Sequence, residues 1–333
     1  MVEPRAAPSP RGRYSPLRWL FTTPGPAVAV SIVPERVTAV QVESGRQGAV
    51  VRGHGRAPLP EGAVRPAVRD SNLADAAVVA DAVDDALGQL PRRPRRVALL
   101  LPDGAARVSM VRFANVPARA ADLDAMIRWQ IRRTVPFGVD EAQLDWSPGR
   151  RTAGGEQEFV VVVAQRTVIE EYEQACTAAG VHAGLVDLLG FGLIDAALAG
   201  GAGDDGADWL LVHTGAGSIS LAVVRGRHPL LFRTVAAHGQ APGAFVHQTA
   251  MYYEDRLGGA GLARALIAGA GDAPDGAGAV RRSVEDRLAV AVEPVAGRLA
   301  PLVSETDGPD PALLDGLAAP VGVLLRDPGA AGA

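Results

Sequence analysis

Lysine is absent from the 333-residue chain, so all 33 of its basic residues are arginines. Schiff-base catalysis needs a lysine amine, and the phosphate loop of P-loop NTPases needs a lysine on the bound phosphates. The composition therefore excludes the first chemistry and argues against the second class of enzyme.

Cysteine is almost absent as well. Cys176 is the only one, so the chain has neither a disulfide framework nor a thiolate metal cluster, which fits a reducing compartment. We expect the Cys176 side chain to pack in the interface of a helix with the core. The six histidines never stand at i, i+4 spacing with a carboxylate partner, and the sequence predicts no metal site.

Long hydrophobic runs are also missing. The apolar runs at residues 97–101 and 159–164 have the length of core strands, well short of the roughly 18 residues that cross a bilayer. The net charge of -4 and the pI near 5.9 give no overall field that favours nucleic acid. We therefore expect a protein of the cytoplasm that binds no DNA or RNA.

The first 26 residues combine arginines and prolines with a short apolar cluster at residues 17–21. This composition predicts a disordered basic tail. The alternative is an anchor for a membrane or a partner, since arginine beside tryptophan and phenylalanine suits an anionic headgroup surface. Residues 327–333 are expected to form a second, short tail.

Two stretches half a chain apart look alike. Residues 28–42 and 210–224 each consist of an apolar strand, a tight turn and a second strand, which is the pattern of a hairpin. The repetition predicts two like domains that face each other across a shared cleft. Between them, the small and acidic residues 199–208 are expected to form a hinge.

Strands and helices mix in both halves, which is typical of an α/β protein. The apolar residues 321–326 are expected to form a last strand. The clearest helical pattern covers residues 122–135, where Arg128, Trp129 and Arg132 lie away from the apolar face. Trp129 either packs under a neighbouring subdomain or contacts a partner, because tryptophan and arginine are common interface anchors.

Several short motifs follow in order after residue 100. They are Leu101-Pro102-Asp103, Ile127-Arg128-Trp129, Pro136-Phe137, Asp140-Glu141 and Leu144-Asp145-Trp146. In this order and spacing the chain resembles the PilM family of type IV pilus assembly proteins, from about residue 27 to residue 326.

The resemblance implies an α/β, actin-like (Hsp70/actin) fold of two duplicated domains around a nucleotide cleft, with a small inserted subdomain. The first domain is expected at residues 27–200, with the insertion at about 95–165, and the second at residues 207–326. The resemblance also implies a partner, a PilN-like bitopic inner-membrane protein whose N-terminal tail binds beside the small subdomain. Arg128, Trp129 and Arg132 are the candidate contacts there.

In this fold each hairpin turn carries an acidic residue that orients a hydrated Mg²⁺ near the phosphates. Here Ser31 and His213 stand at the two acidic positions. Val33 replaces a glycine, and Pro34 has no amide to donate. The resemblance predicts a vestigial nucleotide site in two turns. One is the turn of the second hairpin, whose backbone amides could hold a phosphate: Thr214, Gly215, Ala216, Gly217 and Ser218. The other is a glycine turn on the adenosine side: Gly269 and Gly271.

We therefore expect a cytoplasmic scaffold of the pilus assembly platform, peripheral to the inner membrane, with a degenerate ATPase site. We assign no cofactor, although ATP could still bind the cleft. Self-association and binding to pilus motor or platform proteins are also left open. The alternatives are an active actin-fold ATPase, a small-molecule kinase, or a cytoplasmic component of a type II secretion platform. A kinase would need intact acidic turns and a general base, which neither hairpin supplies.

Overall fold

The computed structural model describes residues 25–45, 48–215, 217–236, 242–269, 276–304 and 311–326. The expected N-terminal and C-terminal tails lie outside these residues, apart from Gly25 and Pro26. Within the described part, no helix is both long and apolar enough to cross a bilayer.

A six-stranded sheet of order β14-β3-β2-β1-β4-β8 takes five strands from residues 28–188 and its edge strand β14 from residues 303–304. Its strands are β1 (Val28–Val33), β2 (Arg36–Gly45), β3 (Gly48–Pro58), β4 (Arg96–Leu101), β8 (His182–Leu188) and β14 (Val303–Ser304). β1, β2 and β3 pair antiparallel, whereas β4 and β8 add to β1 in parallel. The hairpin predicted at residues 28–42 and the core strand predicted at residues 97–101 are confirmed.

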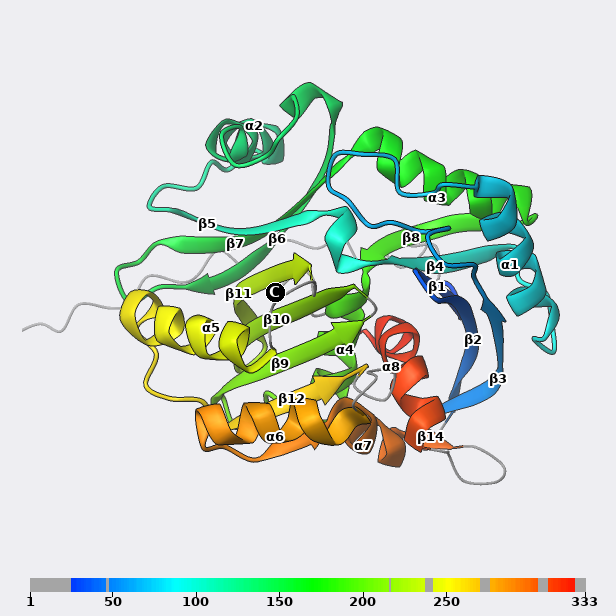
Figure 1. Ribbon diagram of the computed structural model, residues 1–333. Coiled ribbons are helices and arrows are strands. Elements are labelled where there is room, and N and C mark those ends of the chain that lie inside the picture. Colours follow the sequence, from blue (N-terminus) through cyan, green and yellow to red (C-terminus); the bar gives the residue numbers. More distant parts are fainter. Residues whose placement is uncertain are drawn as a thin grey trace, which may run out of the picture.

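The second half repeats this arrangement in a five-stranded sheet of order β11-β10-β9-β12-β13 (Figure 1). Its strands are β9 (Asp208–Gly215), β10 (Ser218–Arg225), β11 (His228–Ala236), β12 (Arg264–Ala268) and β13 (Val292–Pro294). Three strands again pair antiparallel, and two more follow in parallel. The duplication read from the two hairpins is therefore confirmed.

Helices cover the outer face of each sheet. These are α1 (Ala76–Gly88) and α3 (Arg166–Ala178) on the first sheet, and α5 (Pro242–Leu257) and α6 (Gly276–Leu288) on the second. Between the inner faces lie α4 (Leu189–Ala199), α7 (Val295–Leu299) and α8 (Pro311–Leu325), which share one core with both sheets. Figure 1 shows α8, in red, between the two halves.

Side chains of a strand alternate between the two faces of its sheet, and this alternation places the inward residues. In β1, Val28, Val30 and Ile32 belong to the outer core, whereas Ala29 belongs to the core between the sheets. Ser31 shares the inward face with Ala29. The period of two therefore directs the Ser31 side chain toward the space between the sheets.

A separate three-stranded sheet, β5-β7-β6, comes from the middle of the first half. It consists of β5 (Arg107–Phe113), β6 (Ala142–Arg151) and β7 (Gln157–Gln165), and α2 (Ala120–Ile131) packs on it through Leu123, Ile127 and Ile131. Residues 96–101, expected at the start of the small subdomain, belong instead to the six-stranded sheet as β4. The first strand of the small sheet, β5, begins after β4, at Arg107.

The strand expected at residues 321–326 is wrong, because this segment belongs to the helix α8. β14 and α8 follow the second half in sequence but pack on the first sheet. β14 pairs with β3, and α8 packs against the inner face of the first sheet as well as against α4. Residues from 303 onward were expected within a domain at 207–326. They instead connect the C-terminal part of the chain to the first sheet.

The segment at residues 199–208 is a packed turn rather than an open hinge. Ala202 is fully buried in the core between the sheets. A Cβ at Gly203 would lie 2.3 Å from the Gly226 carbonyl oxygen, and the Arg264 guanidinium donates to the Ala202 carbonyl oxygen at 2.8 Å. The glycines of this segment therefore permit close packing. From composition alone, glycines that allow close packing cannot be told from glycines that make a segment flexible.

Candidate functional site

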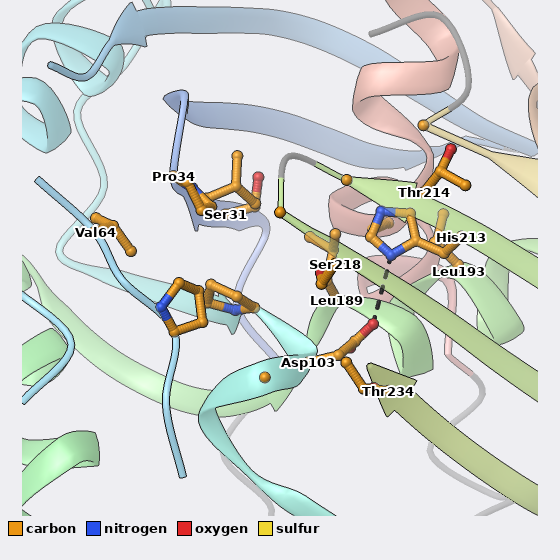
Figure 2. A pocket seen from close by; sticks show the side chains of 18 of the residues that line it. Ser31, Pro34, Val64, Asp103, Leu189, Leu193, His213, Thr214, Ser218 and Thr234 are labelled. Atoms are coloured by element: carbon orange, nitrogen blue, oxygen red, sulfur yellow. Dashed lines mark hydrogen bonds and ion pairs between the residues drawn. The ribbon is translucent and has the colours of Figure 1, made fainter. Parts of the chain in front are cut away.

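A cleft of about 740 Å³ opens between the two halves of the molecule (Figure 2). The β1–β2 and β9–β10 hairpins both line it, as the sequence predicts. The other walls come from residues 64–68 and 102–108, the N-terminal end of α4, β11, residues 268–269 and α8. Most of the lining is apolar, so the polar groups that remain decide what the cleft can bind.

The first hairpin contributes residues 31, 33–36 and 38 to the wall of the cleft, among them the half-buried side chain of Arg36. Ser31 is buried and pairs with Thr38 across the hairpin. Pro34 stands in the turn, where a phosphate-binding loop would use a backbone N–H that proline lacks. This turn therefore offers less to a phosphate group than a glycine-rich one.

The second hairpin places Thr214, Gly215, Gly217 and Ser218 on the cleft. Gly217 has a φ of 81°, the left-handed region that glycine adopts readily, which explains its place in the tight turn. Gly269, after β12, also lines the cleft with a φ of 73°. Ala216 and Gly271 lie outside the described residues.

His213, which stands at the position where the resemblance implies an acidic residue, faces a carboxylate. Its Nδ1 lies 3.4 Å from Oδ2 of Asp103, whose side chain is 1% exposed (Figure 2). Because a carboxylate only accepts hydrogen bonds, this contact places the imidazole hydrogen on Nδ1. In the neutral ring Nε2 is then a hydrogen-bond acceptor.

Asp103 also accepts the backbone N–H of Gly190 through Oδ1, at 2.7 Å. Gly190 lies in the first turn of α4, where backbone N–H groups have no partner within the helix. The carboxylate thus caps the helix that points its N-terminal end at the cleft. Sequence reasoning used Asp103 only as part of a turn and a family motif, and missed its place in the site.

A second carboxylate of the cleft, that of Asp315, was missed entirely. Its Oδ2 accepts the backbone N–H of Gly269 at 3.0 Å. Asp315 lies in the first turns of α8, and this part of the chain carried no expected site residue. No local signal in the sequence connects Asp315 with a glycine that lies 46 residues earlier.

Two polar atoms of the cleft wall are buried without a hydrogen-bond partner among the described residues. They are Oγ1 of Thr214, a residue that is 8% exposed, and Oε1 of Glu35. Buried polar groups usually find a partner because leaving one unpaired costs about 1–3 kcal/mol. The two atoms therefore mark positions where a ligand could supply hydrogen bonds.

The predicted contact residues lie on α2, away from the cleft. Trp129 is 61% exposed, which contradicts the alternative that it packs under a neighbouring subdomain. The Arg132 guanidinium lies 5.1 Å from the centre of the indole ring, and Arg128 pairs with Asp124 at 2.7 Å. The three side chains form an exposed basic and aromatic surface, termed here the α2 surface.

Among the described residues, no group of three or more histidine, cysteine or acidic side chains has the geometry of a metal site. Asp103 and Asp315 have protein N–H partners instead. In the cleft, the carboxylates of Asp103 and Asp315 are therefore bound to the protein's own donors, whereas Oε1 of Glu35 has no partner among the described residues.

Comparison with known proteins gives a family and a fold. The family described as Type IV pilus assembly protein PilM matches residues 29–256. No curated protein is significantly similar in sequence.

Among solved structures, a PilM-PilN type IV pilus biogenesis complex is 19% identical, with a TM-score of 0.71 over 89% of this chain and 98% of that one. A Bacteroides thetaiotaomicron protein of unknown function with an actin-like ATPase fold is 7% identical, with a TM-score of 0.47 over 86% and 94% of the two chains. The ethanolamine utilization protein EutJ from Carboxydothermus hydrogenoformans is 12% identical, with a TM-score of 0.45 over 92% and 91%.

The expected fold class is confirmed: two duplicated α/β halves, with a small sheet inserted in the first, form an actin-like fold. With a family match over residues 29–256 of 333, the chain belongs to the PilM family of type IV pilus assembly proteins.

Proposed function

We propose that the chain is a non-catalytic scaffold at the cytoplasmic face of the inner membrane, which binds the N-terminal tail of a PilN-like bitopic protein during type IV pilus assembly. Membership of the PilM family supports the pilus role. The similar solved structure is a complex of PilM with PilN, and this chain covers 98% of the chain it matches there. The proposed role is therefore in assembly of the pilus machinery rather than in catalysis.

The α2 surface is the part of the molecule to which we assign the partner. Among the described residues, Trp129 is the most exposed large hydrophobic side chain, and Arg132 lies over its ring. An indole beside guanidinium groups provides apolar contact area and charge in one place, which is typical of residues that dominate binding energy. The tail of the partner would bury Trp129.

The second part of the proposal is that the protein has lost ATPase activity. The main support is the contact between His213 and Asp103 in the cleft. A neutral imidazole supplies no negative charge for Mg²⁺, which prefers oxygen ligands. Ser31 leaves the opposite hairpin without a carboxylate at its equivalent position. We infer that the cleft does not turn over ATP with magnesium.

The domain limits belong to the same proposal. We place the division between the duplicated halves near residues 201–207, since the second sheet begins with β9 at Asp208. The small sheet, with α2, would then be the partner-binding subdomain of the first half.

Peptide binding tests the scaffold role. A fluorescent peptide with the sequence of the PilN-like tail should bind the full chain, and Trp129→Ala should weaken binding by at least about tenfold, as expected for a central interface anchor. Tyr252→Ala is the matched control, because Tyr252 is an exposed aromatic side chain on α5. Equal affinities for the wild type and Trp129→Ala would assign the tail to another surface.

ATP turnover tests the loss of catalysis. With magnesium present, phosphate release by the wild type should not exceed that of His213→Ala. Hydrolysis clearly above that control would overturn the non-catalytic assignment while leaving the peptide result intact.

A further inference from the structure

Four arginines lie in the segment that leads from α1 into β4, and the proposed function gives them no role. The segment, termed here the basic run, covers residues 91–96 with the sequence Pro-Arg-Arg-Pro-Arg-Arg. All four arginine side chains are exposed. The guanidinium groups of Arg92 and Arg95 form no hydrogen bond or ion pair with another described residue. Their charges are therefore not used within the described part of the chain.

The basic run is packed on its neighbours. Pro91 contacts β3 so closely that a Cβ at Gly53 would lie 2.4 Å from Cδ of Pro91. The Arg96 guanidinium donates to the Gly184 carbonyl oxygen on β8 at 2.8 Å. Each of the two prolines also fixes its own φ angle. The segment therefore presents its charges from a defined position.

Nearby carboxylates only partly offset the charge of the basic run. Asp84 pairs with Arg93, and Asp85 is exposed in the last turn of α1. Asp81 lies one helical turn farther from this end of α1. Four guanidinium groups thus stand against two carboxylates. Such an exposed positive patch attracts an anionic surface that comes within about one Debye length.

The basic run lies at the end of the first sheet that is opposite to the cleft. β1 and β4 are parallel, and the residues that follow them, 34–36 and 102–108, line the cleft. The basic run instead leads into β4. Figure 1 shows α1 at the right of the molecule and α2 at the upper left. A contact at the basic run would therefore leave the cleft and the α2 surface uncovered.

The surroundings of the basic run favour a lipid surface over a nucleic acid. Ala29 of β1 lies beside Ala98 of β4, so the start of β1 is next to the basic run. Residues 1–24 join the described chain at Gly25, just before β1. Arginine together with aromatic side chains suits an anionic headgroup region. By sequence these residues contain Arg5, Arg11, Arg13, Arg18, Trp19 and Phe21.

From these observations we infer that the basic run is a contact surface for anionic phospholipid headgroups. The inference rests on the proposed function, which places the scaffold at the inner membrane, and it names the lipid contact. Arg92 and Arg95 would bind headgroup phosphates, for which the guanidinium group is well shaped. Because the attraction is electrostatic, it should weaken as salt is added.

Vesicle binding by the full chain, without any partner peptide, tests the inference. Vesicles of phosphatidylglycerol and phosphatidylethanolamine are compared with vesicles of phosphatidylcholine by co-sedimentation at low and high salt. The protein should bind the anionic vesicles at low salt, release them at high salt and leave the neutral vesicles unbound. Absence of binding, or equal binding to both kinds of vesicle, would overturn the inference.

Substitutions locate the contact. Arg92→Gln with Arg95→Gln should lower vesicle affinity about tenfold or more, since each basic residue near an anionic surface adds about fivefold. Thermal stability should not change, because neither guanidinium has a partner among the described residues. Arg92→Lys with Arg95→Lys keeps the charge and should retain most of the affinity. A loss without recovery in the lysine variant would contradict an electrostatic contact.

Arg282→Gln with Arg287→Gln is the matched control. It removes the same charge from exposed positions on α6, on the outer face of the second sheet, and should leave vesicle binding nearly unchanged. Equal losses in the two glutamine variants would show an effect of net charge alone and overturn the assigned surface. Duplex DNA that binds the full chain more tightly than anionic vesicles would assign the arginines to nucleic acid instead.

The outcome is separable from that of the proposed function. Loss of vesicle binding with intact binding of the partner peptide would refute the lipid contact alone. Vesicle binding by a chain that does not bind the peptide would refute the proposed partner and leave the lipid contact standing.

Discussion

A single carboxylate, that of Asp103, satisfies two donors from different halves of the fold. Oδ1 accepts from Gly190 at the start of α4, and Oδ2 faces His213 on β9. Because Asp103 is almost fully buried, its loss would leave both donors without a partner in a place that water hardly reaches. The residue therefore connects the two walls of the cleft through its contact with His213.

Asp103→Ala should accordingly lower the free energy of unfolding by about 2–3 kcal/mol, the cost of two buried donors without acceptors. Asp103→Asn retains an acceptor oxygen and should lose clearly less. Urea denaturation of the two variants checks this. Equal losses would mean that the contacts of Asp103 contribute little beyond the volume of its side chain.

Cys176 makes a second prediction at this scale. Its side chain is fully buried in the outer core of the first sheet, and burial raises the pKa of the thiol to about 12. The thiolate is the reactive form, so a maleimide should label Cys176 only in molecules that unfold. Since the chain has no other cysteine, the labelling rate in urea reports opening of this core. Fast labelling of the native protein would contradict the burial.

The residues of the cleft could be predicted where their position depends on nearby residues in the sequence. Ser31, Pro34 and His213 were assigned to the cleft from their places in two hairpins. Asp315 could not be assigned, because its contact with Gly269 joins two distant elements. The unpartnered state of the Thr214 hydroxyl likewise depends on what surrounds it in three dimensions.

At the scale of elements, α4 and α8 cross at unusually close range. A Cβ at Gly192 would lie 2.5 Å from the Ala319 carbonyl oxygen, and a Cβ at Gly322 would lie 2.0 Å from the carbonyl oxygen of Gly192. These contacts involve backbone atoms, which cannot rotate away as a side chain does. The glycines thus set the distance between the helices that separate the two sheets.

Gly322→Ala should therefore destabilise the protein by about 2 kcal/mol or more, although alanine is the better helix former. Gly88→Ala is the control: Gly88 ends α1, and its added methyl group would meet nothing within 4 Å. That substitution should be neutral or stabilise by about 0.5–1 kcal/mol. Thermal melts of both variants compare the two sites, and a stable Gly322→Ala would mean that the crossing relaxes freely.

The last helix also shows why an apolar run is ambiguous. Residues 321–326 favour a strand by composition, and Pro320 argues against a helix interior. In the structure α8 lies in the core between the sheets, with Leu317, Ala318, Ala319, Val321 and Val323 all buried. A helix that is buried on most sides loses the polar face that sequence patterns detect.

For the whole molecule, a half-buried ion cluster connects the C-terminal end of the described chain to the first half. Arg326 pairs with Asp195 on α4 at 2.7 Å and also with Asp187 on β8. Burial raises the pKa of Asp195 to about 6, against the opposing effect of Arg326. Two carboxylates thus share one guanidinium, and the folded state favours a proton on the cluster.

Between the unfolded pKa of 3.8 and about 6, the folded protein holds a proton on Asp195 that the unfolded chain has released. Its contribution to stability is therefore present at low pH and is lost as the pH rises through this window. Asp195→Asn should remove this loss, so its stability relative to the wild type should increase by about 1–2 kcal/mol from pH 4 to pH 7. Urea midpoints across that range measure the difference. A falling relative stability would reverse the assigned sign.

The return of β14 and α8 to the first sheet has a consequence for biosynthesis. The six-stranded sheet begins with the first described strand, yet its β3 edge and its inner face are completed by residues 303–325. Its contacts therefore span almost the whole sequence, an arrangement that slows folding because distant segments must meet. During synthesis, the apolar inner face of the first sheet would stay uncovered until residues 303–325 have been made, so we expect the nascent chain to bind chaperones.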